Sequence, residues 1–122
     1  TNEFQSDLNA LLDTSLRFVA NRRDRVIMLS IPDWTVTPVG QQVTAREPQH
    51  AAELDAFNLA IKAVAKDRGF RVIDITPLSR LAQNDPALLA ADGLHPSALQ
   101  YTQWNSLLVP AVQAALAHNT GR

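Results

Sequence analysis

The sequence predicts an α/β fold with a parallel sheet, and three observations carry that prediction. Two short, nearly continuous apolar runs, 26–31 and 70–75, have the composition of strands buried on both faces. Amphipathic helical segments stand before, between and after these runs, which gives the order helix, strand, helix, strand, helix. Proline, glycine or polar turns bound the segments. Strands separated by a helix pair in parallel through a crossover connection.

The composition fits one globular domain of 122 residues. Hydrophobic residues make up 46% of the chain, which supplies enough apolar surface to exclude a disordered protein. A net charge of −1 gives no strong attraction to nucleic acid, and no apolar run is long enough to span a membrane. The chain has no cysteine, and His50, His95 and His118 are too scattered for a ligand triad. We therefore expect no metal and no cofactor, and the composition does not fix the compartment.

The first half of the chain predicts a helix over 6–23, capped by Ser6. The apolar face of this helix comprises Leu8, Leu11, Leu12, Leu16 and Val19. The first strand, 26–31, ends at Pro32, and 32–48 is predicted to be a long loop because it holds three prolines and a glycine. Loops of that length in compact domains are often functional.

The second half predicts a helix over about 49–68, ended by Gly69, and a strand over 70–75. Short helical turns are expected within the irregular segment 78–96. Ser97 and Gln100 form a capping box for the last helix, whose tail we expect to fray from about residue 118. Pro110 is expected to kink or divide that helix. Its predicted buried stripe comprises Leu99, Trp104, Leu107, Leu108, Val112 and Leu116.

Two strands that are apolar on both faces cannot be covered by three helices alone. The sequence therefore predicts further strands, supplied either by a segment ahead of Thr1 or by another chain. The first helix, which no strand precedes, supports the same expectation.

The strongest candidate for chemistry is the pair Asp92 and His95, just before the last helix. A catalytic imidazole needs a carboxylate on its Nδ1–H, which fixes the tautomer and stabilises the imidazolium. Gly93 allows the backbone to turn so that the two side chains meet. The alternative is a helix-entry turn with a surface histidine, because this spacing is common.

A serine nucleophile would complete such a pair, but no serine lies in a Gly-x-Ser-x-Gly or Gly-Asp-Ser turn. Ser79, which follows the second strand, is the least unsuitable, although nothing marks it. Trp34 and Trp104 are candidates either for lining an acyl pocket or for packing. Asp33, at a strand end, also suggests a phospho-acceptor, but that class requires five strands and a lysine ending the last one.

The chain resembles the SGNH hydrolases, or GDSL-type esterases and lipases. The segment Asp92-Gly-Leu-His95-Pro96, followed by Ser97, Tyr101 and Trp104, resembles their C-terminal signature. Segments 26–38, 52–58 and 70–77 resemble the penultimate strand, the helix that follows and the last strand. The resemblance covers about residues 1–117.

The resemblance implies a flavodoxin-like three-layer parallel sheet and hydrolysis of small carboxylic esters through an acyl-enzyme. It implies that His95 is the general base and then the acid, that Asp92 orients it, and that Asn2 donates to the oxyanion. The Gly-Asp-Ser block of the family is absent, so residues 1–122 are expected to be the C-terminal part of one hydrolase domain. A companion N-terminal segment or chain would supply the serine. The alternative is a non-catalytic α/β interaction module or an inactive fragment.

Overall fold

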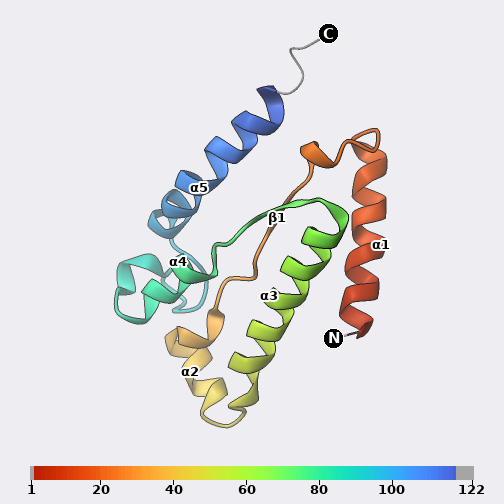
Figure 1. The fold of residues 1–122 in the computed structure, drawn as a ribbon. Helices are drawn as coiled ribbons and strands as arrows, with labels where there is room; N and C mark the ends of the chain where they lie inside the picture. Colours follow the sequence, from red (N-terminus) through yellow and green to blue (C-terminus); the bar gives the residue numbers. More distant parts are fainter. Residues whose placement is uncertain (1, 118–122) are drawn as a thin grey trace.

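The computed structural model describes residues 2–117, which form an α/β unit (Figure 1). Residues 118–122, where fraying was expected, lie outside the described residues. The elements in chain order are α1 (Asn2–Phe18), β1 (Ile27–Leu29), α2 (Pro38–Thr44), α3 (Gln49–Arg68), β2 (Arg71–Ile73), α4 (Thr76–Arg80) and α5 (Ala98–Ala117). Strands β1 and β2 pair in parallel, with Ile27 opposite Arg71 and Leu29 opposite Ile73. The α/β class and the parallel pairing are confirmed, and the short helices α2 and α4 are added to the predicted order of helices and strands.

The core lies where α1 and α3 pack on the strands. Its buried members are Leu12, Leu16, Met28, Ile61, Val64, Ala65 and Phe70. Helix α3 ends at Gly69, which takes a left-handed conformation with φ of 72°. The Phe70 amide then donates to the Ala65 carbonyl at 2.8 Å, which turns the chain directly into β2.

Helix α1 differs from its predicted range at both ends. It begins at Asn2, so Ser6 lies inside the helix and does not cap it. The extra turn is stabilised by Phe4, which packs edge-on against Phe57 of α3, with ring centroids 4.7 Å apart. The helix stops at Phe18 because Ala20 and Asn21 take positive φ angles, which end the helical hydrogen bonding.

Segment 32–48 is not the irregular loop that its prolines predict. Residues Trp34–Val36 form a 3₁₀ turn, and α2 follows at once. The Thr37 hydroxyl accepts from the Gly40 amide at 3.0 Å. Pro38 occupies the first helical turn, where backbone amides have no acceptor within the helix, so the amide hydrogen that proline lacks is not missed. A Cβ at Gly40 would lie 2.0 Å from the Trp34 carbonyl oxygen, so only glycine fits there.

Helix α5 confirms only part of the predicted stripe. Trp104 is buried as predicted, and Ala111 and Ala115, which lie outside that stripe, are buried as well. The Ala111 carbonyl accepts from the side chain of Arg71 in β2 at 3.1 Å. Leu99, Leu107, Val112 and Leu116 are exposed. Pro110 does not divide the helix; it is itself exposed, so water can reach the carbonyl group that loses its partner.

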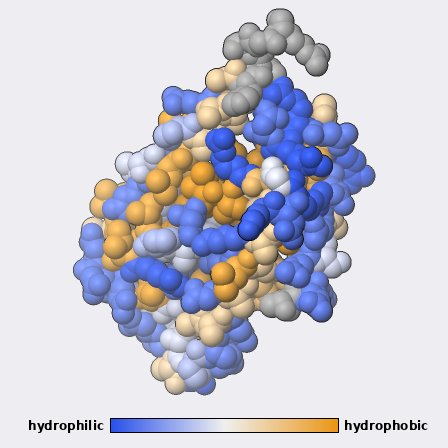
Figure 2. Space-filling view, viewed as in Figure 1, coloured by the Kyte–Doolittle hydropathy of each residue, from blue (hydrophilic) through white to orange (hydrophobic). Residues whose placement is uncertain are grey.

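Strand β1 is not buried on both faces among the described residues. Met28 is buried, but Leu29 is 37% exposed and Leu11 of α1 is 62% exposed. Both leucines line an apolar groove of about 240 Å³ beside β1. Figure 2 shows apolar surface gathered over the middle of the face that Figure 1 presents. No helix within residues 2–117 combines the length and the apolar character needed to cross a membrane.

Candidate active site at the ends of the strands

The chain segment between α4 and α5 closes into a small hairpin. Leu89 and Pro96 form an antiparallel bridge, and the Ala90 amide donates to the His95 carbonyl at 2.8 Å. Gly93 sits at the tip with φ of +68°, a conformation that glycine adopts at little cost. The Gly93 amide donates to the Ala90 carbonyl at 3.0 Å. The turn is therefore fixed by its own backbone.

Ser97 anchors the hairpin to the start of α5. Its amide donates to the Leu88 carbonyl at 2.9 Å, and its hydroxyl donates to the Ala87 carbonyl at 2.7 Å. The hydroxyl also accepts from the Gln100 amide at 3.3 Å, so Ser97 caps α5 as predicted. The other bond of the predicted capping box, from the Ser97 amide to the Gln100 side chain, is wrong. The buried Gln100 side chain donates to the Leu88 carbonyl instead. That bond adds another tie across the base of the hairpin.

The hairpin brings Asp92 and His95 together. Asp92 Oδ2 lies 2.6 Å from His95 Nδ1. Asp92 Oδ1 accepts from the amides of Leu94 and His95, each at 3.0 Å, so the carboxylate is held on both oxygens. The hydrogen bond from His95, together with the two amides, lowers the pKa of Asp92 to about 2. The carboxylate is therefore ionised at neutral pH.

His95 lines a cavity of about 300 Å³ whose walls come from the ends of both strands. The wall residues include Pro32 and Trp34, which follow β1, and Ser79, which follows β2. The His95 side chain is 70% exposed. With Nδ1 committed to Asp92, Nε2 is the ring nitrogen left to exchange a proton with another group.

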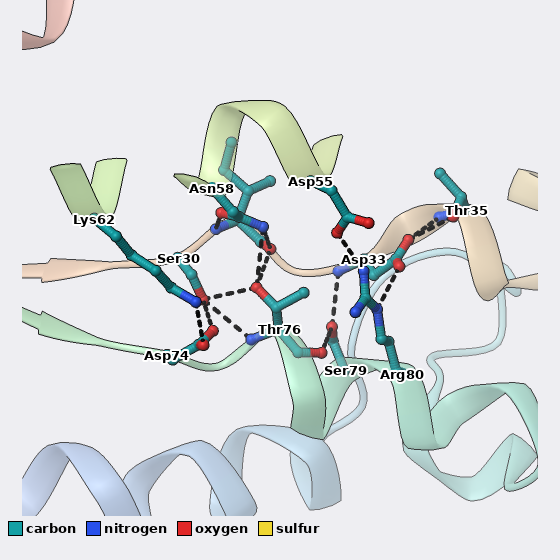
Figure 3. A network of polar contacts seen from close by, with 11 residues as sticks. Ser30, Asp33, Thr35, Asp55, Asn58, Lys62, Asp74, Thr76, Ser79 and Arg80 are labelled. Carbon is teal, nitrogen blue, oxygen red and sulfur yellow. Dashed lines mark hydrogen bonds and ion pairs between the residues drawn. The ribbon is translucent and has the colours of Figure 1, made fainter. Parts of the chain in front are cut away.

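A buried polar network fixes the strand ends on which this cavity rests (Figure 3). The Ser30 hydroxyl donates to Asp74 Oδ1 at 2.8 Å and accepts from the amides of Ile75 and Thr76. Burial alone would raise the pKa of Asp74, but hydrogen bonds from Lys62 and Ser30 outweigh burial and hold it below its usual value. The network joins the two strands just beyond their last paired residues.

Asn58 of α3 ties the helix to both strand ends. Its side-chain oxygen accepts from the Ile31 amide at 2.7 Å. Its side-chain nitrogen donates to the Ile31 carbonyl and to the Thr76 hydroxyl, each at 3.1 Å. Asn58 is 5% exposed, so these bonds are shielded from water.

Asp33 is buried at the foot of the cavity, and its negative charge is balanced there by neighbouring hydrogen-bond donors. Its carboxylate accepts from the amide and the hydroxyl of Thr35 and, at 2.8 Å, from Nε of Arg80. Arg80 also pairs with Asp55. Burial opposes ionisation of Asp33, but these hydrogen bonds prevail and lower its pKa. Asp33 is thus a structural anion and not an open acceptor.

The other predicted site residues are scattered. Asn2 is the exposed first residue of α1, and no hydrogen bond within residues 2–117 joins it to Asp92 or His95. Ser79 lines the cavity, but its buried hydroxyl donates to the Thr76 carbonyl and accepts from the Asp33 amide. Trp34 lines the cavity, whereas Trp104 is buried and packs edge-on against Tyr101. Within the described residues, no serine hydroxyl is hydrogen-bonded to His95.

Sequence reasoning missed Ser30 and Asn58. Asn58 interrupts the apolar stripe of its helix between Leu54 and Ile61, and a polar residue at a buried helical position is a usable signal. Ser30 gave no comparable signal, because its partners lie more than forty positions away, at residues 74–76. In the part of the chain that the structure describes, no three acidic or histidine side chains are grouped to hold a metal ion.

Comparison with known sequences adds independent evidence. The sequence model of the GDSL-like lipase/acylhydrolase family matches residues 1–103, a span that includes both strands, Asp92 and His95. The chain belongs to the GDSL-like lipase/acylhydrolase family. Membership in this family indicates a hydrolase that acts on esters in general. No curated protein and no solved structure matched the chain.

Proposed function

We propose that this GDSL-like chain carries the acid–base part of a serine hydrolase that cleaves carboxylic esters through an acyl-enzyme. The observation that carries the proposal is the 2.6 Å contact between Asp92 Oδ2 and His95 Nδ1, on a rigid hairpin beside a cavity. In this role Asp92 holds the imidazole in the Nδ1–H tautomer, which leaves Nε2 free to act as a base.

The reaction proceeds in two steps, acylation of the serine and hydrolysis of the acyl-serine, and His95 accepts and returns one proton in each. First, Nε2 of His95 takes the proton of the serine hydroxyl while the serine oxygen bonds to the ester carbonyl carbon. The imidazolium then gives that proton to the departing alcohol, which leaves an acyl-serine. Next, Nε2 takes a proton from water, the hydroxide adds to the acyl carbon, and the proton returns to the serine as the acid leaves. Asp92 keeps its negative charge throughout and stabilises the imidazolium.

The attacking serine is proposed to come from a companion N-terminal segment or chain. Two observations support this: no described serine is bonded to His95, and the apolar groove beside β1 leaves Leu11 and Leu29 exposed. A further parallel strand in that groove would cover both leucines and extend the sheet toward a flavodoxin-like three-layer arrangement. In this proposal residues 1–122 are the C-terminal part of one hydrolase domain.

Asn2 is proposed to donate its side-chain amide to the developing oxyanion. Figure 1 shows α1 beginning at the end of the molecule toward which β1 runs, the end where parallel strands place their sites. The Asn2 side chain is exposed, which leaves it available to a substrate.

The test is ester turnover by the hydrolase assembled with its companion segment. His95→Ala should lower kcat by about a thousandfold or more, while added imidazole restores part of it by replacing the missing base. Asp85→Ala removes an exposed carboxylate from the neighbouring turn and should leave turnover unchanged. Undiminished turnover by a folded His95→Ala variant would contradict the proposal, because the general base would then be another group.

A further inference from the structure

We propose that the cavity beside His95 is an acyl pocket for unbranched, uncharged acyl chains of medium length. This inference rests on the proposed function and deepens it by naming a substrate class. Five apolar wall residues surround the space that His95 borders: Pro32, Trp34, Leu89, Leu94 and Pro96. An acyl chain in this space would place its carbonyl group beside the imidazole.

The polar side chains in the wall are already committed to the protein. The Thr37 hydroxyl donates to the Trp34 carbonyl at 2.7 Å and accepts from the Gly40 amide. The Ser79 hydroxyl is engaged by the Thr76 carbonyl and the Asp33 amide. Figure 3 shows Ser79 turned toward the backbone of residue 33. These groups have little left to offer a polar ligand, and leaving a ligand's polar group unpaired there is costly.

The one acidic side chain in the wall, Asp33, is ionised, and its charge is already paired within the protein. The Asp33 carboxylate faces Thr35 and Arg80 in Figure 3, and its ion pair with Arg80 measures 2.8 Å. Arg80 is shared with Asp55 and does not itself line the cavity. A ligand carrying a negative charge at its far end would therefore meet no free cation inside, and its desolvation would go uncompensated.

The wall that carries Trp34 is fixed rather than adaptable. The Trp34 carbonyl accepts from the amide and the hydroxyl of Thr37, and Gly40 passes too close to admit any side chain. The Trp34 ring also packs near the His50 ring, with centroids 5.8 Å apart. A fixed wall limits how much of a chain the cavity can bury.

The volume sets that limit. A methylene group occupies about the space of one water molecule, roughly 30 Å³, so the cavity holds about ten such groups. Affinity should rise with each added methylene and stop rising once the cavity is full. The expected gain is about threefold to fourfold per methylene before the plateau.

The first measurement is binding to the 122-residue chain, followed by the fluorescence of Trp34. Methyl esters of unbranched acids from acetate to dodecanoate are titrated, and Trp34→Phe identifies the responding ring. The proposal predicts tighter binding with length up to about ten carbons, and binding of monomethyl suberate at least about tenfold weaker than that of methyl octanoate. Equal affinity for methyl acetate and methyl octanoate, or for the charged and neutral esters, would overturn it.

The second measurement assigns the acyl end. In the assembled hydrolase, kcat/KM should follow the length of the acyl chain in methyl alkanoates and stay flat in alkyl acetates of equal carbon number. Leu94→Ala should move the plateau to longer chains, whereas Leu99→Ala, the same change at an exposed position outside the cavity, should not. Dependence on the alcohol chain, or an unmoved plateau in Leu94→Ala, would overturn the acyl assignment.

The two proposals fail separately. Length-independent binding together with turnover that requires His95 would overturn the acyl pocket and leave the hydrolase mechanism standing. Length-dependent binding together with turnover that survives His95→Ala would overturn the mechanism and leave the pocket as a ligand site.

Discussion

The His95 hairpin and the polar network at the strand ends border the same cavity but are built in opposite ways. In the hairpin, Asp92 and His95 are three residues apart, and both side chains are more than half exposed. In the network, Asn58 reaches Ile31 across 27 positions, and Ser79 reaches Asp33 across 46, in buried surroundings. The hairpin is therefore suited to moving protons at a surface, and the network to fixing the frame beneath it.

Replacing the hairpin acid should affect turnover far more than folding. Asp92→Asn keeps a side-chain oxygen for the two amides but loses the charge that supports the imidazolium. We expect kcat to fall by about a hundredfold or more, with KM and the unfolding midpoint near those of the unaltered protein. Steady-state kinetics and thermal unfolding measure this.

Asp85→Asn is the matched control, because Asp85 caps a neighbouring turn through the Ala87 amide. Asp85→Asn should leave kcat, KM and the unfolding midpoint unchanged. A kcat for Asp92→Asn within about threefold of the unaltered value would remove the assigned role of the acid.

Replacing the central network residue should have the reverse effect. Asn58→Ala leaves the Ile31 amide and carbonyl without their side-chain partner in a buried place. We expect a loss of about 3 kcal/mol in the free energy of unfolding, measured by urea denaturation at neutral pH. Asn105→Ala, on the exposed side of α5, should change it by less than about 0.5 kcal/mol. Equal losses in the two variants would show that the network does not hold the frame.

The smallest expected effect is at His50, which lies outside both regions. Its two ring nitrogens each lie 2.9 Å from a carboxylate, Glu53 on one side and Glu47 on the other. These bonds raise the pKa of His50 above 6.5. Because the folded-state pKa is the higher one, the stabilisation is complete below pH 6.5 and is lost as the pH rises through the folded pKa.

The thermal midpoint difference between the protein and His50→Gln should therefore be larger at pH 5.5 than at pH 8.5. The double variant Glu47→Gln, Glu53→Gln should remove that dependence. A difference that grows with pH would contradict the assignment.

The same contrast explains what the sequence could predict. The end of α3 at Gly69 and the Asp92–His95 contact depend on neighbours within a few residues. The parallel pairing joins distant residues, such as Ile27 and Arg71, but it follows from the crossover helix that the sequence places between the two strands. The buried face of α5 was predicted only at Trp104, because the burial of Ala111 and Ala115 depends on partners far along the chain, such as Arg71, which donates to the Ala111 carbonyl. The same holds for Ser30 and Asn58, whose partners are brought close only by the complete fold. Helix α2 was missed because Pro38 lies in its first turn, where a proline starts a helix instead of breaking it.

The most direct test of the account is the tautomer of His95 in the 122-residue chain, observed by ¹⁵N nuclear magnetic resonance of the neutral imidazole. The account predicts a protonated Nδ1 and an unprotonated Nε2, with this preference weakened in Asp92→Asn. A neutral ring protonated at Nε2, or a tautomer ratio that Asp92→Asn leaves unchanged, would contradict it.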